Sequence, residues 1–300
     1  MPPTSTNPTL SDAILYTLCT RPSWSEGASG HRTAACNARH LVSHLGGDTR
    51  LGDITPARVA VLRTALAADG RSPATVNRVL SVLSTVLRHC HQDGLLDGAP
   101  IPIRREKESE GRLTWFTKEQ VHELCLLAID RCDEGLASLI NFAAYTGLRR
   151  GEIWRLRQKD INWEAGHITV GGDAATVTKN RSVRIVPLCS LSRKALRYIW
   201  EPCPKPDCSL DVSSMAPWAE LFPNVDVAMR RFNAIRRAAG LPDDLVFHSL
   251  RHSFGTWHAE AGTPIRTLMA LMGHKDIKTT LRYAKVTDQS LFTAMEALEK

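Results

Sequence analysis

The helical pattern of this chain stops between Gly98 and Arg112, and the interruption divides the sequence into two parts. The interval holds two prolines and then a mixed run of basic and acidic residues, without apolar periodicity. Such composition is typical of a boundary between domains. We therefore predict a first domain over 1–97, a solvated linker over 98–112 and a second domain over 113–300.

The first part has the pattern of a small all-helical domain. Its longest predicted helix begins at Ser72-Pro73, because serine caps a helix N-terminus and proline suits the first helical position. Apolar residues then recur at helical spacing on one face, and the opposite face carries short polar and basic side chains that suit phosphates or base edges. Three earlier helices are expected, at about 10–19, 30–45 and 56–70.

The second part mixes helices with short strands. Thr117 to Gln120 form a capping box, and the helical pattern that follows continues to Tyr145. Short strands with a turn between them are expected next, then helices from Leu191, interrupted by a proline-rich loop at 202–217. The predicted strands are 160–163, 167–170, 175–178 and 183–187. The predicted fold class is mainly α with a small β-sheet (α+β).

Composition restricts the partners of this protein. A net charge of +7 and a pI of about 9.1 favour an anionic partner. The N-terminal residues lack a secretion pattern and no apolar run reaches membrane length, so a cytoplasmic location and reduced cysteines are expected. Cys203 and Cys208 do not have the spacing of a zinc site. We predict neither a metal nor a cofactor.

Four short segments of the second part carry groups suited to phosphoryl transfer, a reaction that needs a nucleophile, charge stabilisation and a proton donor. Planar arginine side chains hold two phosphate oxygens at once, as lysine cannot. A tyrosine hydroxyl supplies a nucleophile, although packing is the commoner role of tyrosine. The polar sequence ahead of the tyrosine argues against a core position. The candidate catalytic residues are Arg149, Lys179, His248, Arg251, His274 and Tyr283.

These segments resemble the signature boxes of the tyrosine recombinases, the phage integrase family. The resemblance rests on four stretches and on the lysine-bearing turn before Arg184: Thr146-Gly147-Leu148-Arg149-Arg150-Gly151-Glu152, His248-Ser249-Leu250-Arg251-His252, Leu271-Met272-Gly273-His274 and Thr279-Thr280-Leu281-Arg282-Tyr283. It implies a helical core-binding domain followed by a catalytic domain. At one position, many family members have serine where this chain has Gly151.

The resemblance implies a role for each candidate. Tyr283 would attack phosphorus and leave a 3′-phosphotyrosyl bond, Lys179 would protonate the departing 5′ oxygen, and the two histidines would bind phosphate oxygens. His248 could instead cap the helix that carries Arg251. Glu152 is expected to hold an arginine or a histidine in place. Arg150, His252 and His258 are not expected to participate, and Arg150 should lie on the surface.

The implied partners are double-stranded DNA at a specific recombination site, three further copies of the chain, and accessory DNA-bending proteins. The free protein would be a monomer or weak dimer. A C-terminal helix with Leu291, Met295 and Leu298 on one face would dock on a neighbouring protomer or on its own domain. The candidate DNA-binding residues are Arg71, Thr75, Arg78, Arg88, Arg181 and Arg184.

Several alternatives remain open at this stage. Within the fold, we favour an integrase of a phage or other mobile element, and a Xer-type chromosome-dimer resolvase is the main alternative. A type IB topoisomerase would cleave without strong sequence preference. A catalytically silent DNA-binding protein would lack one of the six groups, and none is missing. A metal-dependent nuclease would need clustered carboxylates, which are dispersed here.

Overall fold

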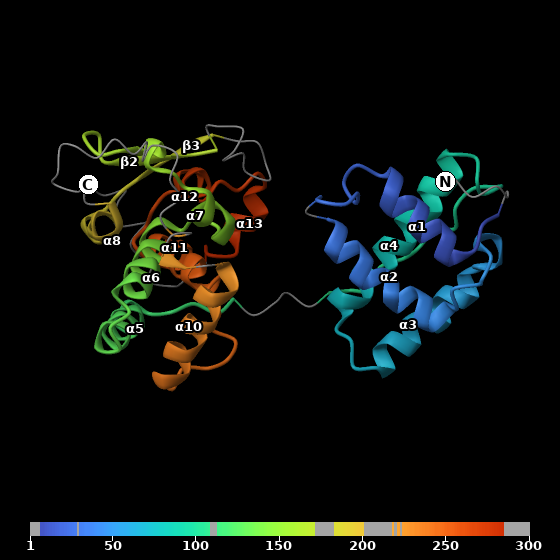
Figure 1. Ribbon diagram of the computed structural model, residues 1–300, viewed down its shortest axis with the longest axis horizontal. Helices are drawn as coiled ribbons and strands as arrows, with labels where there is room; N and C mark the ends of the chain where they lie inside the picture. Colours follow the sequence, from blue (N-terminus) through green and yellow to red (C-terminus); the bar gives the residue numbers. More distant parts are fainter. Residues whose placement is uncertain are drawn as a thin grey trace, which may run out of the picture. The chain divides into compact units, whose positions relative to one another are not determined.

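The computed structural model describes residues 7–28, 30–108, 113–171, 183–200, 218, 221–222 and 224–284. The chain forms two compact units, Met1–Gly111 and Arg112–Lys300. Both are helical where described, and the second also contains a three-stranded sheet (Figure 1). The predicted fold class, mainly α with a small β-sheet, is confirmed.

Four α-helices build the described part of the first unit. Thr9, Thr55 and Ser72 cap three of them, each hydroxyl accepting a hydrogen bond from a backbone N–H of the first turn. The predicted apolar face of the fourth helix is buried, with Val79 and Leu83 fully covered. The helices are α1 (Leu10–Thr20), α2 (His31–Leu45), α3 (Pro56–Ala68) and α4 (Pro73–Gln92), with a 3-10 turn at Leu51–Asp53.

The segment 98–108, which we expected to be part of a solvated linker, belongs to the first unit, and most of its residues are exposed. The side chain of Asn77, on α4, donates to the carbonyl of Glu106 at 2.9 Å and accepts from its backbone N–H at 2.7 Å. The Glu106 carboxylate forms an ion pair with Arg63 of α3, Nε to Oε1 2.9 Å. Ile101 and Ile103 pack against the core. A buried amide and an ion pair therefore attach this segment to α3 and α4.

The second unit is built around α6, which packs against α5, α8 and α11. The sheet is antiparallel in the order β1-β2-β3, with Ile168 of β2 opposite Val186 of β3. It lies at the end of the unit away from α5 and α10 (Figure 1). The elements are α5 (Lys118–Asp130), α6 (Glu134–Thr146), α7 (Arg150–Arg155), a 3-10 turn at Gln158–Asp160, β1 (Ile161–Asn162), β2 (His167–Val170), β3 (Arg184–Pro187), α8 (Ser190–Trp200), α10 (Val225–Ala238), α11 (Ser249–Glu260), α12 (Ile265–Met272) and α13 (Ile277–Leu281).

Three of the four predicted strands correspond to these strands. The strand expected at 175–178, the turn with Lys179, and the proline-rich loop at 202–217 lie outside the described residues, as does the C-terminal helix. No helix within the described ranges has the length and apolar character that a membrane span requires.

Candidate active site

A sharp turn at the end of α6 positions the first candidate arginine. Gly147 ends α6 in the left-handed conformation, φ 61°, and an added Cβ there would overlap the ring of Phe254. Two residues later, Arg149 begins α7 as its N-cap residue. Glu152 accepts hydrogen bonds from the backbone N–H of Arg149 at 2.8 Å and from its Nη1 at 2.9 Å. The expected support of Arg149 by Glu152 is thus present as a contact.

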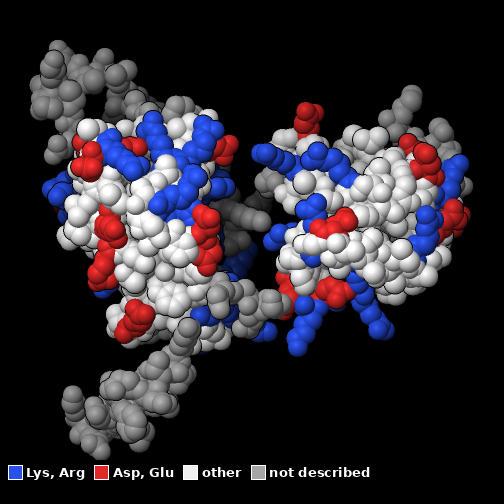
Figure 2. Space-filling model, turned by 90° about the horizontal axis from the view of Figure 1, so that it is seen from below, with Lys and Arg blue, Asp and Glu red and all other residues white. Residues whose placement is uncertain are grey.

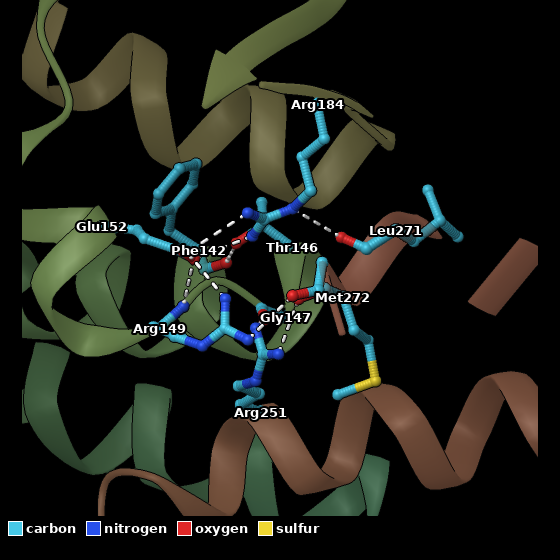
Figure 3. A network of polar contacts seen from close by, with 10 residues as sticks. Phe142, Thr146, Gly147, Arg149, Glu152, Arg184, Arg251, Leu271 and Met272 are labelled. Carbon is cyan, nitrogen blue, oxygen red and sulfur yellow. Dashed lines mark hydrogen bonds and ion pairs between the residues drawn. The ribbon is translucent and has the colours of Figure 1, made fainter. Parts of the chain in front are cut away.

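The second candidate arginine connects two turns of the fold. Arg251, on α11, is 4% exposed and donates to the carbonyls of Gly147 at 2.5 Å and Met272 at 2.6 Å. Arg149 reaches the same region, because its Nη2 donates to the carbonyl of Gly273 at 2.9 Å. Burial, followed by repulsion from Arg149, lowers the pKa of Arg251 to about 9. Backbone carbonyls therefore hold the two guanidinium groups close together (Figure 3).

Glu152 is shared between two arginines. Arg184, on β3, contacts its carboxylate at 2.7 and 3.1 Å and donates from Nε to the carbonyl of Leu271 at 3.0 Å (Figure 3). The side chains of Glu152 and Arg184 are only 2% and 8% exposed. Burial alone would raise the pKa of Glu152, but hydrogen bonds and charge from Arg184 and Arg149 lower it to about 2.

The position of Arg184 changes the role that we assign to it. We expected a side chain that contacts DNA, but its guanidinium is buried and paired with Glu152. Arg184 links β3 to the residue that holds Arg149, so it supports the site from within. The sequence pattern did not separate these roles, because an arginine at a strand start suits either.

The two candidate histidines lie beside these arginines. Burial, and then the charge of Arg251, lower the pKa of both, that of His274 to about 4. His274 is oriented by a hydrogen bond of 2.9 Å between its Nδ1 and the hydroxyl of the buried Thr280. His248 is the N-cap residue of α11, but its side chain makes no capping hydrogen bond. Both rings are therefore neutral near pH 7 and available to hydrogen-bond a ligand.

Tyr283 lies in a small core, which the polar sequence before it did not predict. Its ring is 6% exposed and packs with Phe254, Leu268 and Met272. The ring of His274 lies nearly parallel to it, with centroids 6.3 Å apart and an interplanar angle of 6°. Burial raises the pKa of Tyr283, and the nearby charges of Arg251, Arg282 and Arg149 oppose that change.

His252 is in contact with the tyrosine hydroxyl, although we did not expect it to participate. Its Nδ1 lies 2.8 Å from Oη of Tyr283. Burial, and then the charge of His248, lower the pKa of His252 to about 4. A signal existed in the sequence, since His252 follows His248 by one helical turn and so shares its helix face.

The candidates fall into three groups in the structure. Five of the six catalytic candidates lie in one site around the Gly147 and Gly273 turns, and Lys179 and Arg181 lie outside the described residues. Arg150 is exposed, as expected. In the first unit, Arg71, Arg78 and Arg88 are exposed and Thr75 is partly covered.

The site has the chemistry of an anion-binding pocket. A cavity of about 560 Å³ adjoins it, lined by Arg149, Arg150, Gly151, Met229, Asn233, Val246, Phe247 and His248. Figure 2 shows basic side chains interspersed with acidic ones on the visible face of either unit, so charge is not concentrated in one block there. Among the described residues, no group of His, Cys, Asp and Glu could hold a metal ion.

Comparisons with known proteins agree with this chemistry. The model of the phage integrase family matches residues 114–290. Tyrosine recombinase XerC of Rhizobium meliloti (strain 1021) is 29% identical over 263 residues, covering 84% of this chain and 80% of the relative. The integrase of Salmonella phage P22 is 28% identical over 233 residues, covering 73% of this chain and 55% of that integrase.

Solved structures share the fold. The Tn1549 transposon integrase in complex with transposon right end DNA superposes with a TM-score of 0.76 at 19% sequence identity. The match covers 97% of this chain and 100% of the integrase chain. A lambda integrase dimer bound to a COC′ core site gives a TM-score of 0.73 at 18% identity, covering 93% and 78%. At such identities, the likeness concerns the arrangement of the chain and not its individual residues.

Proposed function

The chain belongs to the phage integrase family, and from that membership we propose that it is a site-specific tyrosine recombinase that cuts and rejoins DNA. One observation carries the proposal. Arg149, Arg251 and Tyr283 come from distant segments, yet both arginines bind adjacent turns and both act electrostatically on the tyrosine. This arrangement supports a site in which two anion-binding groups and a nucleophile act at one point.

Phosphate binding is the first step. The guanidinium groups of Arg149 and Arg251 would hold the non-bridging oxygens of the scissile phosphate and stabilise their charge as it increases in the transition state. His248 and His274 would hydrogen-bond the same oxygens. Because backbone carbonyls and Glu152 already orient the arginines, little reorganisation is needed when DNA binds.

Two transesterifications follow. Oη of Tyr283 attacks phosphorus, so that the Tyr283 O–P bond forms as the P–O5′ bond breaks. The phenol proton passes to solvent water, and Lys179 donates a proton to the departing 5′ oxygen. In the reverse sense, the 5′-hydroxyl of another strand attacks the phosphotyrosine and releases Tyr283. The phosphodiester energy is retained in the covalent bond, so the scheme uses no ATP and no metal.

We propose that the protein acts on double-stranded DNA in the cytoplasm as a tetramer that forms a Holliday junction, with accessory DNA-bending proteins as further partners. A lambda integrase tetramer bound to a Holliday junction shares the fold, with a TM-score of 0.68. In the first unit, Arg71, Thr75, Arg78 and Arg88 would contact the DNA. The biological setting that we propose is integration or excision of a phage or other mobile element.

A Xer-type resolvase is the second candidate, and the extent of the alignments favours it. The chain covers 80% of the XerC relative from Rhizobium meliloti but 55% of the phage P22 integrase. A resolvase would act at a site of the host chromosome, whereas an integrase would act at the ends of a mobile element. The location of the cleaved sequence therefore separates the two settings.

A covalent trap tests the proposal. The protein and, separately, Tyr283→Phe are incubated with fragmented genomic DNA from the source organism and denatured, and protein-linked ends are sequenced. We expect wild-type adducts that cluster at one sequence, and none from the variant. Scattered ends would indicate a topoisomerase, and tight binding without any adduct would indicate a catalytically silent DNA-binding protein.

A further inference from the structure

The hydroxyl of Tyr283 is held by a residue outside the six catalytic candidates. We propose that His252 is a positioning residue, which keeps Oη of Tyr283 beside the two arginines of its own protomer before DNA arrives. This inference rests on the proposed function, because it concerns the same nucleophile. It adds a group to the site whose task is to orient the attacking oxygen.

The position of His252 suits that task. It follows Arg251 on α11, so the helix that places a phosphate-binding arginine also places this ring. The Nδ1 of His252 and Oη of Tyr283 are 2.8 Å apart, and the ring centroids are 5.9 Å apart. His248 packs edge-on against His252, with centroids 4.9 Å apart and an angle of 87°, which restricts rotation of the His252 ring.

The tautomer of His252 sets the direction of this hydrogen bond. Burial raises the pKa of Tyr283 and lowers that of His252 to about 4, so both groups are neutral near pH 7. In the tautomer that carries the ring proton on Nε2, which our proposal assigns to His252, Nδ1 accepts the O–H of the phenol. The lone pair of Nδ1 thereby fixes the direction of the O–H bond and the position of Oη.

His252 is a poor candidate for removing the phenol proton. Burial raises the pKa of Tyr283 and lowers that of His252 to about 4, so transfer of the phenol proton to His252 is disfavoured in the resting site. A hydrogen bond that only orients the Tyr283 hydroxyl requires no proton transfer. A correctly placed nucleophile accelerates attack, because the reacting atoms start close to the geometry of the transition state.

Gly255, one turn after His252 on α11, lies against the ring of Tyr283 and helps to fix its position. A Cβ added at Gly255 would lie 2.8 Å from both Cε1 and Cζ of Tyr283, closer than real Cβ atoms approach other atoms. Glycine therefore lets the ring lie directly on the helix backbone. With His274 parallel on the ring and His252 at the hydroxyl, three residues define where Oη lies.

The first test needs no DNA. His252→Asn keeps an acceptor near the position of Nδ1, and His252→Gln moves it one bond further along the side chain. The protein is labelled with ¹³Cζ-tyrosine, and Tyr283→Phe assigns the Tyr283 signal among the four tyrosines. We expect the Tyr283 signal of His252→Asn to remain near wild type and that of His252→Gln to shift. An unchanged signal in both variants overturns the proposal.

The second test uses the DNA sequence recovered by the covalent trap. Single-turnover formation of the adduct is measured at saturating DNA, together with DNA affinity by gel shift. We expect His252→Gln to react roughly five to ten times more slowly, the effect of about one neutral hydrogen bond, with unchanged affinity and with near-wild-type rates in His252→Asn. Equal rates in all three proteins, or equal losses in both variants, overturn the proposal.

The two tests separate this inference from the proposed function. If the wild-type protein forms no adduct on any DNA, the recombinase proposal fails. The NMR comparison then still decides whether His252 holds the Tyr283 hydroxyl. Thermal unfolding of each variant shows whether a slower reaction reflects lost folding, which the affinity measurement would register as well.

Discussion

Charged side chains differ in burial and in bonding between the active site and α4 of the first unit. In the site, Arg251 and Glu152 are buried and bonded to specific partners. On α4, Arg78 is exposed, and Arg88 is exposed and donates to the carbonyl of Ser84, four residues back. A buried charge must be paired to be tolerated, so it is held in one geometry, whereas an exposed one remains free to adapt.

The comparison suggests a division of work. The fixed groups suit a reaction that requires accurate placement, and the exposed groups suit attraction to a phosphate backbone, which is long-range and salt-dependent. Substitutions in the two regions should therefore differ in kind. Those in the site should change rate or stability, and those on α4 should change affinity.

The largest effect is expected from Arg251→Lys. Lysine retains the charge but cannot bridge the carbonyls of Gly147 and Met272 or grip two phosphate oxygens. We expect adduct formation to fall at least about a hundredfold, the scale found when one oxyanion contact is removed. Single-turnover cleavage measures it, and Arg197→Lys, at an exposed position of α8, is the control. Equal cleavage rates in the two variants would contradict the view that buried, paired charges of the site control the reaction rate.

Glu152→Gln tests the pairing of the buried charges through pH. The pKa of Glu152 is about 2 in the folded protein, below its ordinary value, so the carboxylate stabilises the fold above about pH 4.5. That contribution, about 3 kcal/mol, is lost as pH falls toward 2. The free energy of unfolding, measured with urea, should decrease as the pH falls over this range, and it should decrease less in Glu152→Gln than in the wild type. If the free energy of unfolding changed with pH in the same way in both proteins, the ion pairs of Glu152 would not stabilise the fold.

Gly255→Ala tests whether the position of the Tyr283 ring depends on the close approach of Gly255. The added methyl group would displace the ring, so we expect adduct formation to slow by about tenfold with DNA affinity unchanged. Gly135→Ala, in α6, is the matched control, because the nearest atom to its Cβ would be Cδ1 of Leu221 at 3.5 Å, an ordinary contact. That variant should react as the wild type does. A normal rate in Gly255→Ala would mean that the nucleophile does not depend on this position.

The smallest effect is expected from Arg78→Ala, which probes the exposed face of α4. Loss of one phosphate contact should weaken binding a fewfold and reduce the salt dependence of affinity by about one unit of slope, without changing cleavage at saturating DNA. Titration by fluorescence anisotropy over a salt series measures this. Arg39→Ala, at an exposed position of α2, serves as the control. Unchanged slope in Arg78→Ala would exclude this face from the interface.

Much of the fold could be predicted because its signals are local. Serine, threonine and proline at helix starts, glycine at helix ends and apolar spacing depend on neighbours within a few residues, and these placed α3 and α4 closely. The grouping of Arg149, Arg251, His248, His274 and Tyr283 was also predicted, from a resemblance of short motifs. Their order along the chain carried that information.

Other features depended on contacts between distant segments. The segment 98–108 attaches to the first unit through Asn77, which lies 29 residues from Glu106 in the sequence. Arg184 turned inward because Glu152 and the carbonyl of Leu271 are brought to it by folding. Neither partner could be identified from the local pattern of charges.

By itself, the sequence determined where helices begin and end, that the chain has two helical parts with a small sheet in the second, and which residue types serve phosphoryl transfer. Only the tertiary structure decided that Tyr283 is buried, that His252 holds its hydroxyl and that Gly255 makes room for its ring. The reason is physical. Secondary structure is set largely by interactions over one or two turns, whereas the partner of a side chain depends on which distant segments the core brings into contact.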